Sequence, residues 1–177
     1  MLRDVGTVDE VLRSHAAELG PDYAAYRNHV YRVLNLCVAQ SSPDAESLEK
    51  VAIAAVFHDL GIWTDGTFDY LSPSIRLASA YLLRAGRAEW TTEIAAMILE
   101  HHKISRYRGG SGPLVESFRR ADWIDVSLGL RRFGLPRSIV GPVLSAWPNA
   151  GFHRRLVQLS LARVRRHPRT PLPMIRL

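Results

Sequence analysis

The chain contains very little cysteine and no long apolar run. Cys37 is the only cysteine among 177 residues, so no internal disulfide can form and no CxxC metal site is available. No uninterrupted apolar segment approaches the roughly 18 residues of a membrane-spanning helix. The first residues, MLRDVGTVDEVLRSH, carry acids where a signal peptide needs an apolar stretch. We therefore expect a cytoplasmic protein without a membrane span.

Acidic residues are absent from the last part of the chain, and lysine is scarce throughout. All seventeen acids lie at or before Asp125, whereas residues 126–177 contain ten arginines. The first 125 residues hold thirteen basic residues, so their net charge is −4 within a chain of +6. A basic end of this kind can contact nucleic acid, acidic lipid or an anionic substrate. With only two lysines against 21 arginines, coding composition accounts for part of the bias, and an ordinary solvated basic face is the preferred interpretation.

Strand patterns are missing as well. We find no convincing alternation of apolar and polar residues and no internal repeat, whereas helix-start and helix-stop signals recur along the chain. Thr7 and Glu10 form a capping-box pattern, and Ser42-Pro43 is a cap and first-turn pair whose helix Gly61 should end. Such signals predict helices over about 7–19, 22–39, 43–60, 73–85, 88–103, 113–128 and 152–166, with a further short helix after residue 136.

These elements predict an all-α fold. A chain of 177 residues that is 47% hydrophobic can bury one good core, and no break in composition marks a second one. We expect a helical domain over residues 1–130, followed over residues 131–177 by a basic helical extension packed on the same core.

Titratable residues interrupt several apolar helix faces. Any one of them has a simple explanation: a lone buried histidine is usually a hydrogen-bonded core residue, and a histidine pair at a helix end is favoured by the helix dipole. Together they match the ligand set of a divalent transition metal, which compensates for their burial by coordinating them. The sequence therefore predicts a metal site. The residues concerned are His29, the His58-Asp59 pair after VAIAAVF (51–57), the His101-His102 pair and Asp122.

These residues carry a resemblance. His29, the pair in FHDLGIW (57–63) and Asp122 in RRADWIDVS resemble the H…HD…D pattern of the HD-domain superfamily of metal-dependent phosphohydrolases. The resemblance covers roughly residues 22–128 and leaves out the basic C-terminal region. It implies an all-helical fold and one metal ion held by His29, His58, Asp59 and Asp122. It also implies a hydrolase in which Asp59 binds the metal and holds the attacking water.

The number of metal ions depends on two further histidines. Members of the superfamily with two ions use two additional, well separated histidines, and here the only candidates are the adjacent His101 and His102. Neighbouring residues of a helix point about 100° apart, so we do not expect both to serve one second ion. We therefore expect a single divalent ion: manganese, iron, cobalt, nickel or zinc. Asp125 is a rival for Asp122, which is preferred because its Ala-Asp context resembles that of the family.

A phosphate ester needs cations around it. Lys103 and Arg106 are candidates for binding a small anionic substrate, together with His101 and His102, and Lys103 is the stronger of the two cations because it adjoins the histidine pair. Asp65 can act as a general acid or orient the water, although it can equally form the turn before Gly66.

Two other functions stay open. An HD-type protein can resemble a hydratase or lyase of a small non-phosphate molecule such as a cyanamide-like compound, or an iron oxygenase of phosphonates. It can also be an inactive HD domain that binds nucleic acid through its basic C-terminus, although every implied ligand is intact. A second copy of the chain is a further partner to be considered.

Overall fold

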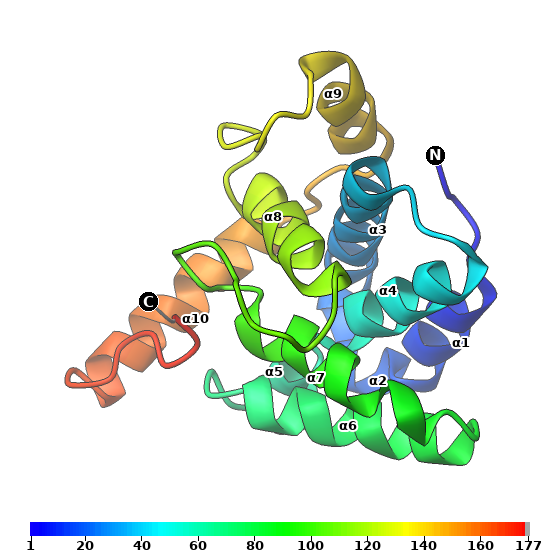
Figure 1. The fold of residues 1–177 in the computed structure, drawn as a ribbon. Coiled ribbons are helices and arrows are strands. Elements are labelled where there is room, and N and C mark those ends of the chain that lie inside the picture. Colours follow the sequence, from blue (N-terminus) through cyan, green and yellow to red (C-terminus); the bar gives the residue numbers. More distant parts are fainter. Residues whose placement is uncertain (176–177) are drawn as a thin grey trace.

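The computed structural model describes residues 1–175 and is all-α, with no strand in this range (Figure 1). The all-α prediction is confirmed. Two 3₁₀ turns, Gly20–Asp22 and Ala88–Trp90, join some of the helices. In chain order the α-helices are α1 (Gly6–Ser14), α2 (Ala16–Leu19), α3 (Tyr23–Ser41), α4 (Ala45–Phe57), α5 (Gly61–Thr64), α6 (Leu71–Arg84), α7 (Thr91–Glu100), α8 (Leu114–Val126), α9 (Arg137–Ala146) and α10 (Phe152–Arg166).

The core lies between α3, α4, α7 and α8. Helix α3 packs chiefly along α8, and α4 packs against α1, α3 and α7. Every residue of VAIAAVF (51–57) in α4 is buried, so the second half of this helix is enclosed on all sides rather than amphipathic. The ends of these central helices are therefore the places where polar side chains can meet in the interior.

Several helix boundaries differ from the sequence prediction. Thr7 lies inside α1, where no side chain caps the helix, and its hydroxyl donates to Glu49 of α4 instead. The predicted capping box is therefore wrong, because the Thr7 hydroxyl forms its hydrogen bond with a residue of another helix. Helix α4 is capped by Asp44, whose side chain accepts a hydrogen bond from the main chain of Ser47. Ser42 has a left-handed backbone conformation, so the helix begins after the predicted Ser42-Pro43 start.

Gly61 begins a helix rather than ending one. Helix α4 stops at Phe57, His58 and Asp59 lie in the following turn, and Gly61 is the first residue of α5. A Cβ atom on Gly61 would lie 2.7 Å from the carbonyl oxygen of Tyr70 and 2.9 Å from Pro73 Cβ. The glycine is thus required for close packing of α5 against the start of α6, which holds the turn containing His58 and Asp59.

The C-terminal part joins the same core. Val140 and Val143 of α9, Trp147 and Phe152 are buried in the main apolar cluster, whereas the rest of α10 is largely exposed and projects beside the body (Figure 1). Within residues 1–175, no helix combines the length and apolar character needed to cross a membrane.

Candidate metal centre

Three elements bring four histidine and carboxylate side chains to one buried point. His29 comes from α3, His58 and Asp59 from the turn after α4, and Asp122 from α8, and each is at most 2% exposed. The Nε2 atoms of His29 and His58 lie 2.9 Å apart. Asp59 Oδ2 lies 3.5 Å from His29 Nε2 and 3.6 Å from His58 Nε2. Asp122 Oδ1 lies 3.8 Å from each of these nitrogens.

Hydrogen bonds outside the cluster orient three of the imidazoles. The Nδ1 atoms of His58 and His101 lie 2.7 Å and 2.6 Å from the carbonyl oxygens of Ala55 and Ile98, which can only accept, so Nδ1 carries the proton. His29 Nδ1 likewise lies 2.6 Å from Asp125 Oδ2. Each ring therefore turns Nε2 toward the cluster. This arrangement, in which the outer nitrogen donates to a carbonyl or carboxylate, is the usual one for metal-binding histidines.

Three carboxylate oxygens of the cluster have no hydrogen-bond partner in the described part of the chain. Asp59 Oδ1 and both oxygens of Asp122 are buried with no hydrogen bond within residues 1–175. An unpaired buried carboxylate oxygen is costly, and a bound cation would remove that cost. Nitrogen and oxygen donors together suit a divalent transition metal, so the residues present fit such an ion.

Burial and neighbouring charges shift the pKa values of the cluster residues. Burial lowers the pKa of His29, but the hydrogen bond with Asp125 and the nearby Asp59 outweigh it and raise that pKa to about 9. Burial lowers the pKa of His58 to about 3 and raises the pKa of Asp122 to about 7. His58 is therefore neutral at pH 7 and can accept a hydrogen bond from a charged His29. A charged His29 places a proton among these ligand atoms, and a bound metal ion would replace that proton.

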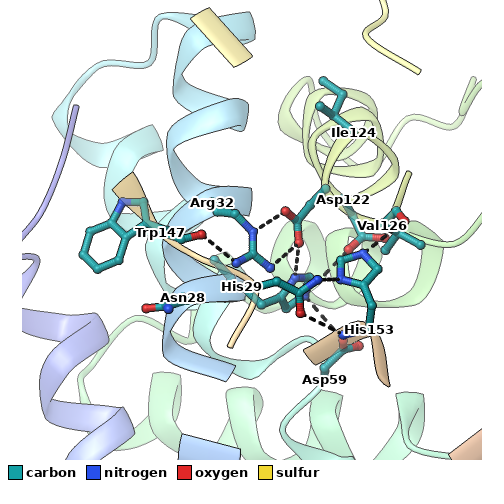
Figure 2. Close-up of polar contacts among 12 residues, drawn as sticks. Asn28, His29, Arg32, Asp59, Asp122, Ile124, Val126, Trp147 and His153 are labelled. Carbon is teal, nitrogen blue, oxygen red and sulfur yellow. Dashed lines mark hydrogen bonds and ion pairs between the residues drawn. The ribbon is translucent and has the colours of Figure 1, made fainter. Parts of the chain in front are cut away.

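Asp125 supports His29 from behind rather than facing the cluster. Its Oδ2 accepts from His29 Nδ1 and, at 3.0 Å, from Arg32 Nη2, and Arg32 Nε donates to its Oδ1. Arg32 also donates to the carbonyl of Trp147 at 2.9 Å (Figure 2). Burial would raise the pKa of Asp125, but His29 and Arg32 hold it at about 2. With both its oxygens engaged, Asp125 is less suited to be a metal ligand than Asp122.

His101 and His102 both reach the cluster. Contrary to the prediction from the sequence, the two histidines do not lie within one helix, because α7 ends at Glu100 and the pair lies in the following turn. His101 Nε2 lies 3.4 Å from Asp59 Oδ1, and His102 Nδ1 lies 3.3 Å from Asp122 Oδ2.

Among residues 1–175, two groups have ligand atoms close enough to hold an ion, namely His29, His58 and Asp59, and Asp59, His101 and His102. Asp59 belongs to both groups. Its Oδ2 faces the first group and its Oδ1 faces His101 in the second.

Comparisons of the chain with protein-family models, curated proteins and solved structures find no match. The helical fold and the buried His/Asp cluster are compatible with an HD-type protein.

Of three further residues expected at the site, Asp65 and Arg106 lie on the surface, and Lys103 directly follows the histidine pair. Asp65 is at the end of α5, where both its oxygens accept from Arg76 Nη2 at 2.8 and 3.0 Å on the exposed surface. The structure therefore does not bring Asp65 to the cluster, because a surface arginine binds it. Arg106 is exposed in the loop after α7. The carbonyl of Lys103 accepts from Arg119 Nη1 and Trp123 Nε1, both at 3.0 Å, which ties this loop to α8.

A pocket of about 330 Å³ adjoins the second group. Tyr70 and His102 form its wall nearest to the cluster, and the tyrosine hydroxyl lies 2.9 Å from His102 Nε2 and 3.4 Å from His101 Nε2. The remaining lining comes from the turn before α6, from α8, from α10 and from the segment after it, namely Phe68, Trp123, Val126, His153, Leu156, Val157, Ser160, Leu172, Met174 and Ile175.

Some of the residues that shape the site were not predicted from the sequence. Arg32 lies one helical turn after His29, so the spacing could have suggested a polar pair on one face of α3. The ring of Phe152 stacks on His29 with centroids 4.0 Å apart and planes 15° apart. Nothing in the sequence indicates this contact, because it joins the first residue of α10 to a helix more than a hundred residues earlier.

Proposed function

We propose that the protein is a metal-dependent hydrolase of the HD type that acts on a phosphate ester. The observation that carries the proposal is the orientation of three imidazoles toward buried carboxylate oxygens that have no hydrogen-bond partner in residues 1–175. A site that merely stabilised the fold would satisfy those oxygens with protein donors. Imidazole nitrogens and carboxylate oxygens suit manganese, iron, cobalt, nickel or zinc.

The residues take separate roles in this proposal. His29, His58, Asp59 and Asp122 would hold the first ion, and His101 and His102 would complete a second position around Asp59. A bound divalent ion would lower the pKa of water and neutralise charge on phosphoryl oxygens. Asp125 would keep the Nδ1 proton of His29 in place, so that its Nε2 lone pair faces inward. Burial of the carboxylates would keep bulk water from competing for them.

A second candidate is a hydratase-type reaction on a neutral molecule. The pocket beside His102 favours it, because no lysine or arginine is among the described residues that line the pocket. Lys103 separates the two candidates: turnover of a phosphate ester should fall in Lys103→Ala, whereas turnover of a neutral substrate should not depend on this charge.

Metal analysis tests the proposal. Wild-type protein should retain a divalent ion after gel filtration, and Asp59→Ala should lose it, because Asp59 belongs to both ligand groups. At an ion concentration about 100 times the Kd, binding should stabilise wild type by about 2.7 kcal/mol against unfolding. A panel of phosphomonoesters, phosphodiesters and nucleotides with Mn²⁺, Co²⁺ or Ni²⁺ should show turnover that Asp59→Ala abolishes.

Asp65→Ala is the matched control. It removes the same side chain six residues away, where the carboxylate binds Arg76 on the surface. Metal content and turnover should stay at the wild-type level. If wild type binds no divalent ion under any loading condition, the proposal fails, and equal losses in the two variants would show that the cluster is not the site of chemistry.

A further inference from the structure

The pocket beside His102 has a composition unlike that expected for a nucleotide. Large apolar and aromatic side chains dominate its lining, among them Phe68, Trp123, Leu156 and Met174, and no acid, lysine or arginine is present among its described lining residues. A volume of about 330 Å³ is at the lower end for small-molecule sites, which are mostly apolar with a few polar groups that fix orientation. The pocket is therefore suited to a small apolar group.

The polar atoms of the lining are largely engaged already. Trp123 Nε1 donates to the carbonyl of Lys103, and His153 Nε2 lies 3.1 Å from the carbonyl oxygen of Val126 (Figure 2). The other ring nitrogen of His153 lies 2.5 Å from Asn149 Nδ2, and the Tyr70 hydroxyl lies 2.9 Å from His102 Nε2. A sugar placed here would give up hydrogen bonds to water and find few replacements, whereas an apolar group would gain from leaving water.

The pocket meets the metal centre at one end. His102 is both a lining residue and a member of the second ligand group, and Tyr70 contacts both His101 and His102. A molecule in the pocket can therefore place its reacting end at the cluster while the rest lies between α8 and α10. The arginines of α10 do not line this space. Arg163 and Arg166 line a separate pocket of about 150 Å³ that shares only Phe68 with the first.

We infer that this pocket binds an apolar, ring-sized group of the substrate, so that the substrate is an aryl or alkyl derivative and not a nucleotide. The inference deepens the proposed function, since it places the reacting group of that substrate at the metal centre. It assigns the recognition of the substrate to α10 and the segment after it, which lie outside the region of the HD resemblance.

Phosphonates that cannot be hydrolysed test the inference. Phenylphosphonate and methylphosphonate share the acid group, but only the first carries a ring. Calorimetric titration of metal-loaded protein with each therefore measures how much the pocket contributes to binding affinity. Phenylphosphonate should bind at least about tenfold more tightly than methylphosphonate, and AMP should gain nothing from its nucleoside. Equal binding of the two phosphonates, or tightest binding of AMP, would overturn the inference.

Two valines of α10 supply a matched pair of variants. Val157 lines the pocket and is 58% exposed, whereas Val164 is 43% exposed and is not among the lining residues. Val157→Trp should fill the pocket and reduce the affinity for phenylphosphonate to that for methylphosphonate, and Val164→Trp should leave both unchanged. Ser160→Trp, also in the lining, repeats the test if Val157→Trp does not fold. A folded lining variant with unchanged affinity for phenylphosphonate would refute the inference.

A probe without an acid group separates this inference from the proposed function. Benzyl alcohol should bind metal-free protein weakly, as seen by saturation-transfer NMR, and Val157→Trp should abolish the signal. Benzyl alcohol binding in a protein that takes up no metal would contradict the proposed function and support the pocket assignment. Metal uptake and phosphate ester turnover without any preference for the phenyl ring would support the function and refute the pocket assignment.

Discussion

Arg32 is predicted to hold in place the hydrogen bonds that surround the proposed metal site. It is 2% exposed and binds Asp125, which is fully buried and in turn binds His29. Arg32→Met keeps most of the side-chain volume but removes the charge. His29 and Arg32 together hold the pKa of Asp125 at about 2. In the variant, the buried Asp125 carboxylate would keep only His29 as a partner. We expect a large loss of stability and a weaker metal site.

The size of the effect follows from the burial of both partners. Breaking a buried ion pair by removing one member costs about 3–5 kcal/mol, because the other charge is left uncompensated. For a chain of this length each kcal/mol lowers Tm by about 2–4 °C, so the expected fall is on the order of 10 °C. Metal affinity should fall by up to about 10- to 100-fold, the usual range for residues that orient a ligand, because Arg32 holds the Asp125 carboxylate that binds His29.

Thermal and chemical unfolding of the metal-free protein measure this loss. Arg76→Met is the control, because Arg76 is 63% exposed and its ion pair with Asp65 should contribute less than about 1 kcal/mol. The double variant Arg32→Met, Asp125→Asn should be more stable than Arg32→Met alone, since it removes the stranded charge and keeps an acceptor for His29. If Arg32→Met costs no more than Arg76→Met, or the double variant recovers nothing, the reasoning is refuted.

Two further predictions concern the segments that hold the site. Burial raises the pKa of Glu116, but hydrogen bonds from Arg119, the main chain of Tyr107 and Arg120 lower it from 4.5 to about 2. The contribution of Glu116 to the free energy of unfolding is therefore fully present above pH 4.5 and is lost as the pH falls through about 2. Because Glu116 is only partly buried, we expect about 1 kcal/mol, seen as a stability difference between wild type and Glu116→Gln that shrinks over this window. A difference that does not change between pH 5 and pH 2 would contradict the assignment. Gly61→Ala should cost about 1–3 kcal/mol in urea unfolding, because its Cβ would lie 2.7 Å from the Tyr70 carbonyl oxygen. Gly141→Ala, with nothing within 4 Å of the new Cβ inside α9, should be neutral or stabilising, and equal losses in both variants would show that packing at Gly61 is not the cause.

Helix existence was predictable from sequence, and helix ends were less so. Periodic apolar residues and Pro or Gly signals depend on neighbours along the chain, so α3, α4 and α10 were expected near their observed places. Thr7 shows why the ends differ. Its hydroxyl fits a capping box, yet Glu49 in another helix offers a stronger partner, and no local pattern reveals that competition.

The amino-acid sequence by itself determined that histidines and carboxylates would lie in the interior, because they stand within or directly after apolar helical segments. Only the tertiary structure decided their roles. Asp122 and Asp125 are one turn apart, but Arg32 engages the second and leaves the first facing the cluster. His101 and His102 both approach the carboxylates because α7 ends just before them. The pocket beside them joins segments from residue 68 to residue 175, and such a contact depends on how distant helices pack.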